Sequence, residues 1–322
     1  MRGRARPVPA MTLEDWKRVV DEAAAHGTET ILVRGGEPFM MPGIIELLDH
    51  IVDRGLFVAI DSNGTCLGGF ADDLVRIGRI HVTVSVDGPE EIHDEVRSRR
   101  GCYQQIAASL RELAAAEERQ GRRISKGITF TISPWSCHGL GAMPDVARSL
   151  GVDTLCIVPY FYVPERLGLA YERELREEFG CEAFSWRGFH HEASGVDPGV
   201  FLDQLRRYKS GLGELSDYPF LPLSEDEYRV WFEDPRKPVA RDDCPNVERL
   251  IDIQPTGEAN FCVDFPDYSL GNVREFTLRE LWNGERAQRF RERRRRRPFS
   301  TCHRCGAKYC GVIRDENGSP SH

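Results

Sequence analysis

The chain has 322 residues, of which 40% are hydrophobic and 29% charged, and a formal net charge of −8 at pH 7. This length accommodates one large domain or two ordinary ones. The acidic balance argues against a general nucleic-acid binder. No apolar run approaches the roughly 18 residues of a transmembrane helix, and the basic N-terminus lacks the apolar segment of a signal peptide. We therefore expect a cytoplasmic protein whose partners include neither nucleic acid nor a membrane.

The first half of the chain alternates between helical and extended patterns. The clearest helix is 11–27, with Thr12 as its N-cap, acidic residues in its first turn and Gly27 at its end. Five short apolar segments, each separated from the next by a helix, are typical of a parallel sheet covered by helices. The predicted strands are 28–36, 56–64, 79–89, 126–133 and 152–160, and the other predicted helices are 42–55, 69–78, 102–121 and 141–151.

The second half is less regular. Segments 171–180 and 199–213 have helical patterns, while 225–243 is polar and interrupted by prolines. Two short strands joined at Thr256-Gly257 predict a β-hairpin. A single helix is predicted over 277–297, and the arginine run at its end, 293–297, is interpreted as solvated cations that offset the helix dipole. An anionic partner for these arginines is the alternative.

Three successive strands end in glycine beside short polar side chains. The endings are Gly35-Gly36-Glu37-Pro38, Asp61-Ser62-Asn63-Gly64 and Ser85-Val86-Asp87-Gly88-Pro89. In parallel α/β sheets ligands bind beyond the carboxyl ends of the strands. Glycines let a ligand approach the backbone, Glu37 suits an amine, Asn63 and Ser85 suit hydroxyls or a carboxylate, and Arg97 suits a carboxylate. The pattern predicts a shared polar ligand.

The ten cysteines are unevenly placed. Five stand singly before residue 182, whereas Cys244, Cys262, Cys302, Cys305 and Cys310 lie in the last quarter. A soluble chain with late, clustered cysteines is typical of a metal site in a reducing compartment. Cys244 and Cys262 bracket the predicted hairpin, and with the pair Cys302-x2-Cys305 they make four soft ligands, enough for tetrahedral zinc or an iron–sulfur cluster. Spacing alone does not separate the two.

Together these residues resemble the radical S-adenosylmethionine (SAM) enzymes that carry a C-terminal SPASM or twitch auxiliary iron–sulfur domain. The resemblance rests on Gly35-Gly36-Glu37-Pro38, on SVDGPEEIHDEVRSRRGCY, and on the pattern that runs from CPNVERLIDIQPTGEANFC through LGN and LWN to CHRC. It covers nearly the whole chain except 161–243. It implies a (β/α)6 barrel lacking its first strand, followed by a small hairpin-and-helix domain that binds a cluster.

The resemblance also implies roles for individual residues. Gly35, Gly36 and Glu37 would hold the methionyl amine of SAM, and Ser85 and Arg97 its carboxylate or ribose. Asn63 and Asp87 lie in matching loops with less defined roles. Cys244, Cys262, Cys302 and Cys305 would ligate one auxiliary [4Fe–4S] cluster, with Cys310 as a possible substitute. The full SPASM pattern has more cysteines, for two clusters, so one twitch-like cluster fits this chain better.

One departure from the family is serious, because the sequence contains no C-x3-C-x2-C motif, which binds the SAM-cleaving cluster. In the family this motif follows the first barrel strand and precedes a helix like 11–27. Our interpretation is an N-terminally truncated chain, inactive alone, with the second [4Fe–4S] cluster present only in the full-length protein. A naturally degenerate, non-catalytic homologue that binds SAM is the alternative.

The expected whole protein is an oxidoreductase or a peptide- or metabolite-modifying enzyme. In this family a 5′-deoxyadenosyl radical abstracts a substrate hydrogen, and electrons come from a donor such as a flavodoxin or ferredoxin. The predicted domains are a partial barrel at 1–160, a substrate-shaping segment at 161–243 and the cluster domain at 244–322. Within the middle segment Trp186, Arg187, His190 and His191 are pocket candidates, although a structural role is favoured for each. A zinc-stabilised binding module remains the rival from another class.

Overall fold

A computed structural model describes residues 9–218, 220–239, 244–306, 313–314 and 320–321. Its centre is a six-stranded, wholly parallel sheet in sequential order, as expected for this α/β fold. The sixth strand, which the sequence pattern missed, has only two residues, too few for a periodic signal. The strands are β1 (Thr30–Val33), β2 (Phe57–Ser62), β3 (Ile80–Ser85), β4 (Ser125–Ile132), β5 (Thr154–Pro159) and β6 (Ser216–Asp217).

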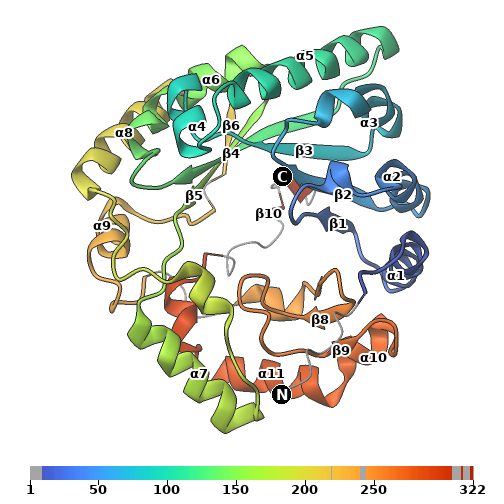
Figure 1. Cartoon of the computed structure of the whole chain (residues 1–322), viewed down its shortest axis with the longest axis vertical. Helices are drawn as coiled ribbons and strands as arrows, with labels where there is room; N and C mark the ends of the chain where they lie inside the picture. Colours follow the sequence, from blue (N-terminus) through green and yellow to red (C-terminus); the bar gives the residue numbers. More distant parts are fainter. Residues whose placement is uncertain (1–8, 219, 240–243, 307–312, 315–319, 322) are drawn as a thin grey trace, which may run out of the picture.

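The strands follow one another around an arc, with helices on its outer side (Figure 1). The first helix begins at the predicted cap, where Thr12 and Asp15 form a capping box. Helix α9 lies in the polar, proline-interrupted segment for which the sequence pattern predicted no element. The helices of this part are α1 (Leu13–Ala25), α2 (Ile44–Asp53), α3 (Ala71–Ile77), α4 (Glu90–Val96), α5 (Cys102–Gln120), α6 (Met143–Leu150), α8 (Pro198–Gly211) and α9 (Glu225–Glu233).

Side-chain alternation gives the sheet two different faces. On β3, Ile80, Val82 and Val84 belong to the large core between the sheet and the outer helices. Because successive side chains of a strand point to opposite faces, Thr83 and Ser85 lie on the inner, concave face. Asp61 of β2 pairs with Thr83 in the parallel register and shares that face. Toward the carboxyl ends of β2 and β3 the concave face is therefore polar, whereas the convex face is apolar.

The C-terminal part forms a three-stranded antiparallel sheet with two helices, and it lies across the open side of the arc (Figure 1). The predicted hairpin is present, with Gly257 at φ +88° in its turn. The single helix predicted over 277–297 is two, because Gly284 has extended backbone angles and separates them. The elements are β7 (Asp252–Ile253), β8 (Glu258–Asn260), β9 (Gly271–Asn272), α10 (Leu278–Asn283) and α11 (Glu285–Arg296), with the short strands β10 (Ile313–Arg314) and β11 (Pro320–Ser321) beyond them.

Helix α1 joins the two parts. Val20 belongs to the core of the large sheet. Val19 belongs to a second core, which it forms with residues of α7 (Glu165–Phe179), α10 and α11. Arg18 donates to the carbonyl of Val273 at 2.6 Å, and the carboxylate of Glu22 accepts from the N–H of Leu278 at 2.7 Å. The C-terminal sheet is therefore packed against the first helix of the barrel. Among the described residues, no helix combines the length and apolar character needed to span a membrane.

Candidate functional site

Four cysteine side chains line one cavity of the C-terminal part. Cys244 immediately precedes a 3-10 turn, and Cys262 lies two residues after the end of β8. Cys302 lies in the short helix η6 (Ser300–Arg304), with Cys305 just after it. The hairpin thus carries the first two thiols to the loop that carries the other two, as the spacing predicts. Among the described residues, the wall also contains one cation, Arg294, together with Val247, Thr301 and the aromatic residues Tyr171, Phe265, Phe290 and Phe299.

The electrostatics of the four thiols reflect their common cavity. Burial raises the pKa of Cys262 well above the ordinary value, and the nearby Cys302, Cys244 and Cys305 raise it further. A thiol in such a place stays protonated until a metal displaces the proton. No three His, Cys, Asp or Glu side chains in the described ranges stand at the mutual distances of ligands to a single metal ion. The structure therefore gathers the four thiols in one cavity, without arranging them around one ion.

Cys310, the possible substitute ligand, lies outside the described residues. The sequence reasoning missed Arg294 and the aromatic wall. Phe290 and Arg294 are one helical turn apart on α11 and so point to the same side, a spacing that the sequence does contain.

The arginine run is not uniformly solvated, so that interpretation is wrong for two of its members. Arg293 and Arg294 are each only 6% exposed. Arg295, Arg296 and Arg297 are exposed, as predicted. Arg293 turns inward to Glu178 of α7 and Arg294 turns inward to the cavity of the cysteines, an orientation that only the tertiary packing decides.

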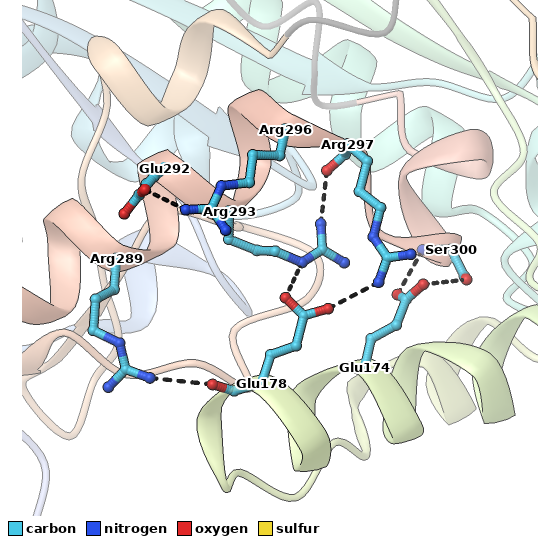
Figure 2. A network of polar contacts seen from close by, with 8 residues as sticks. All are labelled: Glu174, Glu178, Arg289, Glu292, Arg293, Arg296, Arg297 and Ser300. Carbon is cyan, nitrogen blue, oxygen red and sulfur yellow. Dashed lines mark hydrogen bonds and ion pairs between the residues drawn. The ribbon is translucent and has the colours of Figure 1, made fainter.

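Helix α7 holds the cysteine loop through a network of carboxylates, shown in Figure 2. Glu178 accepts from Nε of Arg293 and, at 3.0 Å, from Arg297. Glu174 accepts from the backbone N–H and the hydroxyl of Ser300, both at 2.9 Å. Ser300 is the first residue of η6, so this network fixes the start of the turn that carries Cys302.

We expect Glu178→Gln to lower the free energy of unfolding by roughly 2 kcal/mol, because it leaves the buried Arg293 without its counter-charge. The loss should appear as a lower urea midpoint at an unchanged slope. Glu177→Gln, an exposed neighbour on the same helix, is the matched control. Equal midpoints for the two variants would contradict the prediction.

The contribution of Glu178 depends on pH in a defined direction. Burial by itself raises the pKa of Glu178, but the hydrogen bonds from Arg293 and Arg297 outweigh it and lower the pKa. A carboxylate with a depressed pKa stabilises the fold fully above its unfolded pKa, about 4.3 for Glu. This stabilisation is lost as pH falls through the lower folded value.

The cysteine loop is also anchored to the barrel side by Arg304, which is 1% exposed. Its guanidinium lies between the rings of Trp231 and Tyr162, 3.9 and 4.2 Å from their centroids. It donates to the carbonyl of Trp231 at 2.6 Å. Burial lowers the pKa of Arg304 to about 10. Because Trp231 belongs to α9, the polar segment 225–243 provides a helix that supports the C-x2-C pair.

At the other end of the candidate site, Glu37 joins the ends of β1 and β2. Its carboxylate accepts from the N–H of Phe39 at 3.2 Å, from the N–H of Asn63 at 2.8 Å and from the hydroxyl of Ser62 at 2.9 Å. A carboxylate has about four acceptor positions, so one remains for a ligand. A Cβ added at Gly35 or Gly36 would meet no atom within 4 Å. The loop therefore presents bare backbone and one carboxylate to open space.

The other predicted ligand residues have partners of their own. Asn63 accepts from the N–H of Thr65 at 2.9 Å, and Arg97 donates from Nε to Asp87 at 2.6 Å. The N–H of Asp87 in turn donates to Nδ1 of the buried His93 at 3.1 Å. Asp87 thus stabilises its own loop through its backbone N–H, and its carboxylate binds the Nε side of the Arg97 guanidinium. Ser85 lies at the end of β3, on the concave face.

An ion pair links the two halves of the candidate site. Arg34, next to Gly35, lies 3.9 Å from Asp264, which follows Cys262 by two residues. Burial raises the pKa of Asp264, and the charge of Arg34 opposes that rise. The glycine loop of the barrel and the cysteine segment of the C-terminal sheet therefore face each other.

The four pocket candidates of the middle segment are engaged in packing contacts. Trp186 is buried in the second core and donates to Glu172 at 3.0 Å, and Arg187 pairs with the same carboxylate at 2.6 Å. His190 packs against Trp186, with ring centroids 5.5 Å apart. His191 lies 5.6 Å from the ring of Tyr160, the residue that follows β5. These contacts agree with the structural role favoured for them.

Comparison with known families gives two matches. The profile of the radical SAM superfamily matches residues 2–119. The profile of the SPASM iron–sulfur cluster-binding domain matches residues 244–306, which include the four cysteines of the cavity.

Curated relatives align over parts of their length. The Fe-coproporphyrin III synthase of Methanosarcina barkeri is 29% identical over 153 residues, 47% of this chain and 37% of that protein. The antilisterial bacteriocin subtilosin biosynthesis protein AlbA of Bacillus subtilis is 24% identical over 285 residues, 85% of this chain and 53% of that protein. The chain thus spans about half the length of these relatives or less.

Solved structures share the fold. Streptococcus suis SuiB bound to S-adenosylmethionine superposes with a TM-score of 0.63 at 15% identity, covering 97% of this chain and 67% of that one. The complex of SuiB with the precursor peptide SuiA gives a TM-score of 0.60 at 14% identity, covering 97% and 66%. At these identities the likeness shows the fold alone.

Proposed function

Because the chain belongs to the radical SAM superfamily and carries a SPASM iron–sulfur cluster-binding domain, we propose that the whole protein is a SAM-dependent enzyme that modifies a peptide by hydrogen abstraction. The observation that carries the proposal is the gathering of Cys244, Cys262, Cys302 and Cys305 in one cavity. A reduced [4Fe–4S] cluster with SAM supplies a 5′-deoxyadenosyl radical in this family. The chain's own task is to bind the cofactors and the substrate, to position them and to exclude water from them.

The donor set fits an auxiliary [4Fe–4S] cluster. Four thiols face a cavity whose remaining wall is mostly apolar and aromatic, with a cation on α11. Thiolates are the ligands that iron–sulfur clusters use, and an apolar wall keeps water from them. Glu174 and Arg304 hold the loop of Cys302 and Cys305 in place through hydrogen bonds at Ser300 and at the carbonyl of Trp231. The four thiols that share this cavity would be the ligands of such a cluster.

The glycine loop fits the methionyl end of SAM. Glu37 retains one acceptor position for an ammonium group, beside the bare backbone of Gly35 and Gly36. Ser85 lies two strands from β1 on the concave face and is placed for a carboxylate or a ribose hydroxyl. Arg97, half-exposed and bonded to Asp87 through Nε, keeps its terminal nitrogens for the same ligand. Asn63 and Asp87 shape the loops between them.

A peptide is the favoured substrate class, and a small metabolite is the alternative. The proposal is supported by the long alignment with the subtilosin biosynthesis protein and by the fold shared with SuiB, solved with a precursor peptide. The polar concave face of the sheet, which includes Asp61, Thr83 and Ser85, offers hydrogen-bonding partners for such a substrate. We further propose cytoplasmic localisation and a flavodoxin- or ferredoxin-type electron donor, as the family uses.

The test is the metal and sulfide content of the 322-residue chain purified without oxygen. We expect about four iron and four acid-labile sulfide per chain, with no zinc, as one [4Fe–4S] cluster requires. Zinc without sulfide would instead support the zinc-stabilised binding module. The sequence contains no C-x3-C-x2-C motif, so we propose that this chain alone forms no 5′-deoxyadenosine from SAM under reducing conditions.

A further inference from the structure

Arg294 differs from every other arginine in the run 293–297. Arg293 and Arg297 pair with Glu178, Arg295 pairs with Glu248 and Arg296 pairs with Glu292. Within the part of the chain that the structure describes, Arg294 is the member of the run for which no carboxylate lies within ion-pair distance. It is 6% exposed and lines the cavity of the four cysteines.

A buried cation without a counter-charge is costly, and proteins usually pair it. The thiols facing Arg294 become thiolates when they ligate a metal. Four thiolates around an oxidised [4Fe–4S] core leave a net negative charge, and reduction by one electron makes it more negative still. The negative charge that would balance Arg294 is therefore that of the cluster and its four thiolate ligands.

The position of Arg294 is held from both sides. Its neighbour Arg293 is tied to Glu178 of α7, and Arg295 is tied to Glu248 in the turn that follows Cys244. Phe290, one helical turn earlier, lines the same cavity. These contacts fix the rotation of α11 about its axis, so the guanidinium cannot turn to solvent without breaking them.

We propose that Arg294 is a positioning residue that acts as the counter-charge of the auxiliary cluster and raises its reduction potential. The inference rests on the proposed cluster and deepens the account of that site. Reduction adds one electron to the cluster, while Arg294 stays protonated and transfers nothing. Because a fixed positive charge stabilises the more negative, reduced form more than the oxidised one, it favours acceptance of an electron from a substrate radical.

The test is a redox titration of the auxiliary cluster followed by electron paramagnetic resonance of its reduced form. In Arg294→Gln we expect the ratio of reduced to oxidised cluster at a fixed potential to fall about tenfold, equivalent to a midpoint about 59 mV lower for a one-electron couple. Arg294→Lys keeps the charge and should restore most of the wild-type midpoint. Arg296→Gln, on the exposed side of the same helix and paired with Glu292 rather than with a contact that positions Arg294, is the control and should leave the midpoint unchanged.

The outcomes separate this inference from the cluster proposal. A wild-type chain without iron and sulfide overturns both. A wild-type chain that loads its cluster, with the same midpoint in Arg294→Gln, overturns the role of Arg294 alone. If the glutamine variant does not load, Arg294→Lys decides: loading with a near wild-type midpoint supports the charge, and failure to load shows that the residue serves packing instead.

Discussion

Replacing Cys262 or Cys302 with alanine is expected to remove the auxiliary cluster, so that iron and sulfide fall from about four each per chain to near zero. Each substitution deletes one of four thiols that share a cavity, and the two thiols come from different segments of the chain. The remaining three ligands cannot complete the coordination of the fourth iron. Metal content and the visible absorption of the cluster measure the loss.

The matched control is Cys181→Ala. Cys181 is half-buried and packs against the same core as the four cavity cysteines, but it does not line the cavity. Its replacement should leave the iron content unchanged. Retention of a full cluster by both Cys262→Ala and Cys302→Ala would show that other residues hold it, and would remove the observation on which the proposed function depends.

Glu37→Gln is expected to weaken SAM binding by roughly ten- to a hundredfold, the equivalent of about 1.5–3 kcal/mol for a charge-assisted hydrogen bond. The carboxylate accepts from three donors in the protein and has a position left for the ammonium of SAM. The amide of glutamine offers one oxygen and turns its NH2 toward those donors. Titration calorimetry of the chain with SAM measures the change.

Two controls separate ligand binding from the folding of the loop. Glu46→Gln changes an exposed carboxylate of α2 that pairs with Lys17, and it should bind SAM as the unchanged chain does. The unfolding temperature measured without SAM reports the structural role of Glu37 toward Ser62 and Asn63. A Glu37→Gln chain that binds SAM with unchanged affinity would contradict the assignment of the glycine loop.

The sequence by itself determined most of the local elements and which cysteines share a cavity. Apolar strands separated by helices predicted the parallel sheet, because parallel neighbours need a crossover connection that is usually a helix. Thr12 predicted the start of α1, and Gly257 predicted the hairpin turn, because both residues act on their immediate neighbours. The spacing of the four cysteines around that hairpin was enough to predict that they share a cavity. The assignments of Gly35, Gly36 and Glu37 to SAM remain predictions.

The tertiary structure decided everything that depends on contacts between distant segments. The two-residue strand β6 exists only because β5 offers it an edge, and α9 lies in a polar, proline-interrupted segment for which no element was predicted. The burial of Arg293 and Arg294 could not be read from a run of five arginines. Five consecutive arginines give all sides of a helix the same polarity, so the sequence does not indicate which side is buried. The buried side is decided by the segments that pack against it, here Glu178 of α7 and the cavity of the four thiols.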